Sequence, residues 1–167
     1  MNKIEPKKSN KRLISENSLN RIQIKPRFLK SCGCPSILIV DDQYINRFII
    51  TQYWMKFDIS FEEAENGKEA VEMIRKEANK LCWEGFSLIL MDLNMPVLGG
   101  LQASKLIMED KKQHRISQDT TIIAITAFPS ATLKEEWILV GMTDYKTKPF
   151  SLADFWLLVE KSKKTQM

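Results

Sequence analysis

Acidic, hydroxyl and ammonium side chains follow short strand-like runs at several points of this sequence. The set consists of Asp41 and Asp42 after residues 37–40, Asp92 after 88–91, Thr126 after 121–125 and Lys148 after 143–147. Carboxylates held close together repel one another unless a cation lies among them. The possible metal ligands in this set are all oxygens, without histidine or cysteine. Such ligands suit a hard divalent ion, magnesium best of all. A hydroxyl and an ammonium group facing that ion would match phosphoryl oxygens, and the central carboxylate could become an aspartyl phosphate.

The run at 88–91 is the most informative of these. Its four consecutive apolar residues are too few for a helix, and Pro96 and the pair Gly99-Gly100 follow shortly afterwards. Such a run is typical of a strand buried on both faces of a parallel sheet. Asp92 would then lie at the carboxyl edge of the sheet, where open α/β sheets bind their ligands. Taken alone, Asp92 could equally cap a loop, and it is the matching groups at the other strand ends that favour a site.

Apolar runs and helical periodicities alternate from residue 36 to residue 163. Strands are predicted at 37–40, 59–63, 86–91, 121–125 and 143–147. Helices are predicted at 44–56, at 67–81, from 101 to a frayed end within 109–112, at 130–140 and at 152–163, with a polar loop at 109–119. Strict alternation predicts an α/β fold with a five-stranded parallel sheet and helices on both faces. All five polar side chains would then meet at one edge.

Charge divides the chain into two parts. Residues 1–35 hold nine lysines and arginines against two glutamates, a net charge of +7, which leaves −3 for the remainder of a chain whose total is +4. Low hydrophobicity with high net charge predicts a basic, disordered arm or linker at 1–35, followed by a domain at 36–164 and a tail at 165–167. A basic arm can bind nucleic acid or an acidic membrane, but with one aromatic residue and no clustered basic run a solvated linker is favoured.

Four motifs of this sequence resemble those of response regulator receiver domains. They are Ile37-Leu38-Ile39-Val40-Asp41-Asp42, Met91-Asp92-Leu93-Asn94-Met95-Pro96, Ala124-Ile125-Thr126-Ala127 and Lys148-Pro149-Phe150. The resemblance extends over about three quarters of the chain, from residue 36 to residue 163. It implies a flavodoxin-like, doubly wound fold with the strand order 2-1-3-4-5.

The resemblance also implies roles for individual residues. Asp92 would accept a phosphoryl group from a phosphohistidine on a partner protein. Mg²⁺ would be bound by Asp42, by Asp92, by the backbone carbonyl of Asn94 and, through water, by Asp41. Lys148 would pair with the phosphoryl oxygens, and Thr126 would move to hydrogen-bond them. Tyr145 lies where the family often carries an aromatic ring that turns inward when the threonine moves, although it could also be a half-exposed strand residue.

Two departures from the family pattern lie near the predicted site. Gly99 replaces an aspartate that usually follows the proline motif, and because that aspartate is not a metal ligand, we expect changed loop hydrogen bonds and retained activity. Phe128 lies two residues after Thr126. It could restrict water and lengthen the phosphorylated lifetime, or it could simply pack on Pro129. His114, the only histidine, lies in a polar stretch and is expected to be a solvated surface residue.

Two other classes of protein remain as alternatives. A haloacid-dehalogenase-type phosphatase also forms an aspartyl phosphate beside magnesium, but it requires a second acid where this chain has Asn94. A phosphorylation-independent interaction module with a receiver fold would usually lack one of the five groups.

The resulting prediction is a phosphoacceptor signalling domain whose only catalysis is its own phosphotransfer and dephosphorylation. Its partner would be a histidine kinase or a histidine phosphotransfer protein, with no nucleic acid and no transmembrane segment. We expect a monomer or weak dimer in the cytoplasm, either free-standing or as the C-terminal receiver of a hybrid histidine kinase at the cytosolic end of a membrane-anchored sensor.

Overall fold

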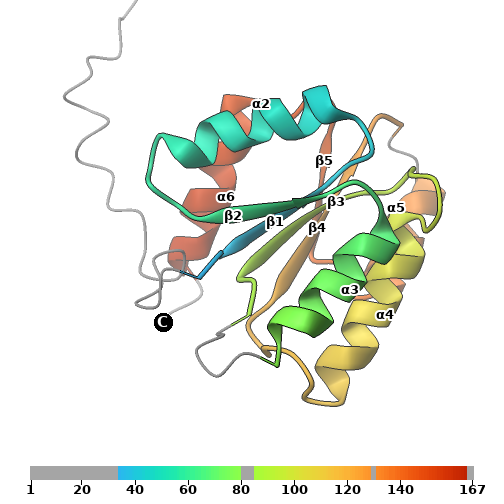
Figure 1. Ribbon diagram of the computed structural model, residues 1–167. Coiled ribbons are helices and arrows are strands. Elements are labelled where there is room, and N and C mark those ends of the chain that lie inside the picture. The colour runs from blue at the N-terminus through green and yellow to red at the C-terminus, as the bar shows by residue number, and fades with distance from the viewer. Residues whose placement is uncertain (1–33, 80–84, 129–130, 165–167) are drawn as a thin grey trace, which may run out of the picture.

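The computed structural model describes residues 34–79, 85–128 and 131–164. The strands are β1 (Ile37–Val40), β2 (Phe61–Ala64), β3 (Leu88–Asp92), β4 (Thr121–Thr126) and β5 (Asp144–Thr147). They form one parallel sheet in the order β2-β1-β3-β4-β5 (Figure 1). The predicted parallel sheet and its strand order are therefore confirmed.

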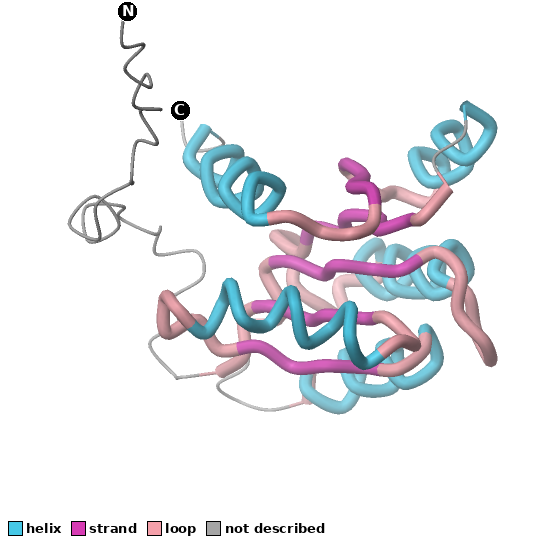
Figure 2. The backbone as a smooth tube through the Cα atoms, turned by 90° about the horizontal axis from the view of Figure 1, so that it is seen from above, coloured by secondary structure: helices cyan, strands magenta, loops and turns pink. Residues whose placement is uncertain are grey.

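Helices cover both faces of this sheet (Figure 2). They are α2 (Tyr44–Met55), α3 (Gly67–Glu77), α4 (Gly100–Lys112), α5 (Ala131–Leu139) and α6 (Leu152–Lys164). The core against α3, α4 and α5 includes Leu38, Val40, Ile89 and Met91, whereas the core against α2 and α6 includes Ile37, Ile39, Leu88 and Leu90. Successive residues of a strand point to opposite faces, so a continuous apolar run can fill both cores. The periodicity of 2 is hidden in the sequence because both faces are apolar.

The first helix buries a face that its apolar pattern does not show. Ile45 and Phe48 are two of its apolar residues, yet their side chains are exposed. The residues buried toward the sheet are Arg47, Ile50, Thr51 and Trp54. Trp54 is fully buried and meets Phe155 of α6 edge to face, with ring centroids 4.8 Å apart. The tryptophan therefore packs in the core, while the outer side of α2 keeps apolar groups in contact with solvent.

The end of α4 corrects one prediction. The acidic and basic run at 109–112 was expected to fray into a loop, but the helix continues through Lys112. Its stability there comes from Asp110, whose side chain is only 1% exposed and binds Arg75 of α3 at 2.7 Å and Arg115 beyond the helix. A buried carboxylate with two arginine partners holds the last turn in place. Polarity alone therefore mislocated this boundary.

The start of α4 places a glycine directly behind β3. A Cβ atom on Gly100 would lie 2.1 Å from the backbone oxygen of Asp92. No other residue fits such a contact, so Gly100 allows the helix to begin immediately beneath the end of the central strand. Within the described ranges, no helix is both long and apolar enough to cross a bilayer.

Candidate functional site

Three carboxylates converge at the carboxyl edge of the sheet, where β1 and β3 end. One oxygen from each of Asp41, Asp42 and Asp92 lies within 4.8 Å of the other two. Lys148, the residue after β5, reaches into this group, and its Nζ lies 2.8 Å from Asp41 Oδ2 and 2.6 Å from Asp92 Oδ2. The structure therefore brings together four side chains that the sequence distributes over three strand ends.

The carboxylate of Asp41 is held by several partners. Its Oδ1 accepts hydrogen bonds from the backbone N–H of Gln43 at 2.9 Å and from Asn46 Nδ2 at 3.0 Å. Its Oδ2 is buried and lies 2.8 Å from Lys148 Nζ. This ammonium compensates the buried carboxylate oxygen, but it is shared with Asp92.

The electrostatics of the site reflect this excess of negative charge. Burial raises the pKa of Asp92, and the hydrogen bond from Lys148 opposes but does not cancel that shift. For Lys148 burial acts in the opposite direction and would lower the pKa, but the contacts with Asp41 and Asp92 outweigh burial and raise it. Asp41 and Asp92 thus share the Lys148 ammonium while Asp42 lies close by, and the burial of Asp41 and Asp92 strengthens both the attraction and the repulsion.

Solvent reaches the site through a cleft of about 420 Å³. The cleft is lined by Gln43, Asn46, Asp92, Asn94, Ala127, Phe128, Lys148 and Pro149. Asn94 donates its backbone N–H to Asp92 Oδ1 at 3.2 Å. Phe128 is 75% exposed at the mouth of the cleft. The alternative prediction, that its ring packs on Pro129, concerns a residue outside the described ranges. The peptide bond between Lys148 and Pro149 is cis.

Thr126 and Tyr145 occupy the neighbouring strands. Thr126 ends β4, is buried, and accepts a hydrogen bond on its Oγ1 from the backbone N–H of Phe128 at 3.2 Å. Asp92 lies opposite Ile125, so Thr126 comes one residue beyond the register partner of Asp92. The ring of Tyr145 is half-exposed, and its centroid is 5.6 Å from that of the buried Trp137 on α5.

Two residues of α2 belong to the site and were not singled out from the sequence. Asn46 binds the carboxylate of Asp41, and Arg47 donates from Nη1 to the Asp41 backbone oxygen at 2.7 Å. The signal in the sequence is that Arg47, Thr51 and Trp54 are spaced i, i+4 and i+7, which places them on one face of the helix. An arginine on the same face as buried residues indicates a buried polar contact. His114, in contrast, is exposed as expected.

The donor set fits a divalent cation. All three converging ligands are carboxylate oxygens, Asp41 and Asp92 are buried, and the negative charge of the three carboxylates exceeds the charge of the Lys148 ammonium that contacts them. Oxygen-only ligands with open access to water are typical of sites for hard divalent cations.

Comparison with known proteins identifies the family. Residues 37–160 match the model of the response regulator receiver domain, so this chain belongs to that family. It is 38% identical over 144 residues to the osmolarity two-component system protein SSK1 of Saccharomyces cerevisiae, covering 73% of this chain and 19% of that protein. It is 33% identical to hybrid signal transduction histidine kinase F of Dictyostelium discoideum, covering 76% of this chain and 11% of the kinase.

Solved structures agree with this assignment. The receiver domain of yeast Ssk1, crystallised with the histidine phosphotransfer protein Ypd1, is 36% identical with a TM-score of 0.66, covering 76% of this chain and 87% of that domain. The Mg²⁺ complex of the receiver domain of the Arabidopsis thaliana histidine kinase CKI1 is 25% identical with a TM-score of 0.68, covering 83% and 96% of the two chains.

The chain is thus a receiver domain of two-component phosphorelay signalling with a flavodoxin-like fold. It spans only a small fraction of the full-length relatives named above. Neither the family nor the structural neighbours support the phosphatase or the phosphorylation-independent alternative.

Proposed function

We propose that Asp92 accepts a phosphoryl group from a phosphohistidine in a Mg²⁺-dependent reaction. The observation that carries this proposal is the cluster of the buried Asp41 and Asp92 with the exposed Asp42, at an open cleft lined by Asp92 and Lys148. Among the described residues, Lys148 supplies the ammonium that contacts this cluster. An Asp92 oxygen attacks phosphorus, the phosphorus–nitrogen bond breaks, and the imidazole leaves with the bonding electron pair. Lys148 pairs with the oxygens of the transferred group.

Magnesium is the cation that we propose for the cluster. Asp42 and Asp92 would bind it directly together with the backbone carbonyl of Asn94, and Asp41 would act through water. The bound ion would neutralise the charge of the phosphoryl oxygens. Support comes from the convergence of the three carboxylates, and from the CKI1 receiver domain, which is similar in structure and was crystallised with Mg²⁺.

Phosphorylation would be transmitted through Thr126 and Tyr145. The modification adds a charge of about −1.5 to −2 beside the end of β4. In the proposed switch the Thr126 hydroxyl turns from the Phe128 N–H toward the phosphoryl oxygens, and Tyr145 repacks into the space released. The ring contact between Tyr145 and Trp137 would pass that movement to α5.

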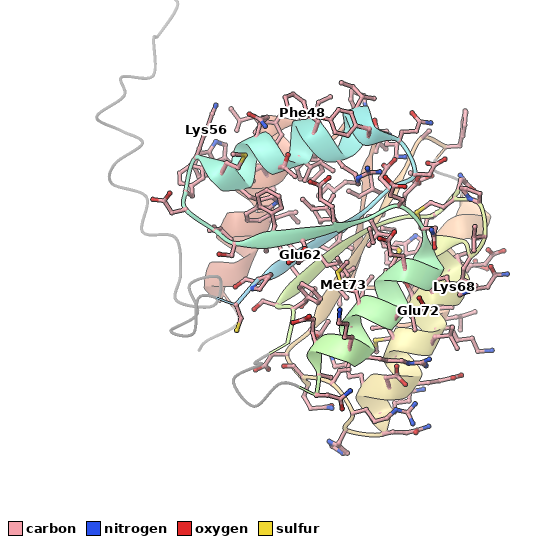
Figure 3. All side chains as sticks on the ribbon, in the orientation of Figure 1. Phe48, Lys56, Glu62, Lys68, Glu72 and Met73 are labelled. Atoms are coloured by element: carbon pink, nitrogen blue, oxygen red, sulfur yellow. The ribbon has the colours of Figure 1, made fainter. Side chains whose placement is uncertain are left out.

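The outer side of α2 offers a docking face for the phosphoryl donor. Tyr44, Ile45 and Phe48 are exposed there, next to the cleft residues Gln43 and Asn46, and Figure 3 shows Phe48 on the side of α2 that faces away from the sheet. We propose a histidine phosphotransfer protein as the partner, because the similar Ssk1 domain was crystallised with one. Apolar contact around the cleft would align the phosphohistidine with Asp92.

The proposal extends to the chain as a whole. The receiver domain would occupy residues 36–164, with 1–35 as a basic linker and 165–167 as a tail, in the cytoplasm, as a monomer or weak dimer. It would act either as a free-standing regulator or as the C-terminal receiver of a hybrid histidine kinase, and the similarity to the hybrid kinase of Dictyostelium discoideum supports the second arrangement. Its catalysis would be limited to its own phosphotransfer and dephosphorylation.

Beryllium fluoride, a mimic of the aspartyl phosphate, tests this function. Mg²⁺ is titrated first alone and then with beryllium fluoride, while tryptophan fluorescence and amide chemical shifts are recorded. We expect Mg²⁺-dependent shifts at Asp92, Thr126 and Tyr145. A folded protein that gives no response would instead be a receiver fold retained for binding alone.

A further inference from the structure

Arg47 is a buried arginine whose side chain connects three parts of the fold. Its side chain is 7% exposed. Nη1 donates to the Asp41 backbone oxygen at 2.7 Å, Nε donates to Glu63 of β2 at 3.0 Å, and Nη2 donates to Glu65 beyond β2 at 2.9 Å. The guanidinium carbon also lies 6.0 Å from the centre of the Tyr44 ring. One helical residue thus ties α2 to the ends of β1 and β2.

The bond to the backbone is the contact nearest to the proposed chemistry. The oxygen of Asp41 belongs to the peptide unit that joins Asp41 to Asp42. A peptide unit is planar, so fixing the direction of this oxygen also fixes the direction in which the chain enters Asp42. Asn46, one residue earlier on α2, holds the carboxylate of Asp41. The first turn of α2 therefore orients both acidic residues that follow β1.

The ion pairs with the glutamates do not account for this arrangement by themselves. The side chains of Glu63 and Glu65 are 37% and 69% exposed, and exposed ion pairs contribute little to stability. The Asp41 oxygen is buried, as is the guanidinium, so the bond between them is protected from water. The two glutamates balance the charge of an arginine whose shortest hydrogen bond, at 2.7 Å, is to the backbone beside the site.

We propose that Arg47 is a positioning residue that orients Asp41 and Asp42 for binding Mg²⁺, an inference that rests on the proposed function. Only a guanidinium can donate in three directions at once from a rigid plane, whereas a lysine ammonium would reach one or two of these acceptors. Groups that orient metal ligands commonly change metal affinity when they are removed. Arg47 would do so without touching the ion or the phosphoryl group.

The test compares Arg47→Met and Arg47→Lys with a matched control, Arg75→Met. Arg75 also binds a buried acceptor, Asp110, but lies on α3 and contacts no residue of the site. Each folded variant is titrated with Mg²⁺, and the amide shifts of Asp92 and Asn94 report binding. We expect Arg47→Met to weaken Mg²⁺ affinity about 10- to 100-fold, with Arg47→Lys in between and the control unchanged to within about twofold.

A second readout separates positioning from general loosening. Without Mg²⁺, the amides of Asp42 and Gln43 should shift in the Arg47 variants and remain in place in Arg75→Met. Unchanged affinity in folded Arg47→Met overturns the inference, as does an equal loss of affinity in the Arg75 control. If Arg47→Met does not fold, Arg47→Lys decides the matter by the same criterion. Failure of the unaltered protein to bind Mg²⁺ would instead refute the proposed function itself.

Discussion

Asp92 and Asp110 are both almost completely buried, yet their surroundings are opposite. At Asp110 two arginines surround one carboxylate: burial alone would raise its pKa, but the hydrogen bonds from Arg75 and Arg115 outweigh burial and lower it. At Asp92 burial raises the pKa, and the Lys148 ammonium is shared by Asp92 and Asp41, with Asp42 close by. The same helix, α4, begins against Asp92 and ends with the turn that carries Asp110.

The contrast separates a structural carboxylate from a reactive one. Asp110 is fully compensated by its own chain, so its burial favours the folded state and offers nothing to a ligand. The cluster around Asp92 is left with uncompensated negative charge that a cation would relieve. The first arrangement stabilises the protein, while the second keeps a binding site ready at some cost to stability.

Replacing Asp92 with asparagine is the largest perturbation that we expect. Asp92→Asn removes the nucleophilic oxygen, so phosphorylation by acetyl phosphate or by a phosphohistidine protein should be abolished. The fold should remain intact, because the change relieves repulsion within the cluster. Phosphate incorporation and thermal unfolding measure the two effects. A fully phosphorylated Asp92→Asn protein would refute the assignment of the site.

Replacing Asp42 tests whether the excess charge is there to bind metal. Asp42→Ala should weaken Mg²⁺ binding by about 10- to 100-fold while leaving the unfolding temperature nearly unchanged, because Asp42 is exposed. Titration followed by amide shifts provides the affinity, and Asp119→Ala, at another exposed acid, is the control. Unchanged affinity in Asp42→Ala would contradict its role as a ligand.

How far the sequence predicts this molecule depends on the range of the interactions involved. The run 37–40 predicts a buried strand because each of its residues enters a core, and parallel strands bring their ends to one edge, so the clustering of Asp41 with Lys148 follows from local patterns. The continuation of α4 does not follow from them, because Arg75 reaches Asp110 from 35 positions earlier in the chain. The buried face of α2 escaped prediction for a similar reason, since Arg47 is stabilised there by partners on β1 and β2.

Replacing Asp110 tests the structural half of the comparison. Asp110→Asn leaves Arg75 and Arg115 without their shared anion and should destabilise the fold by about 2 kcal/mol, a moderate value because both arginines are about half-exposed. Chemical denaturation gives the free energy of unfolding. Mg²⁺ affinity should not change, and a marked loss of affinity would show that the two clusters are coupled.

The two carboxylates should also have opposite pH dependence. The pKa of Asp110 is lowered in the folded protein, so its contribution to stability is present above the unfolded-state pKa and is lost as the pH falls through the folded value. The pKa of Asp92 is raised, so the folded state binds the extra proton, and stability falls as the pH rises from the unfolded-state pKa to the folded one. The free energy of unfolding of the metal-free protein is measured across acidic pH. Its decrease on the acid side should be absent in Asp110→Asn. In Asp92→Asn the decrease on the higher-pH side should disappear instead. Identical profiles in both variants would contradict this difference.

The smallest effect concerns the mouth of the cleft. Phe128 is 75% exposed beside Asn94 and Lys148, and a large ring there can hinder the approach of the water that hydrolyses an acyl phosphate. Phe128→Ala should shorten the phosphorylated lifetime roughly two- to fivefold, equivalent to about 0.4–1 kcal/mol in the barrier. Decay of the phosphorylated protein after removal of acetyl phosphate provides the rate, and Val97→Ala, at another exposed apolar residue that does not line the cleft, is the matched control. An unchanged lifetime in Phe128→Ala would mean that the ring serves contact with the partner, and slower transfer from a phosphohistidine protein would then be the effect to measure.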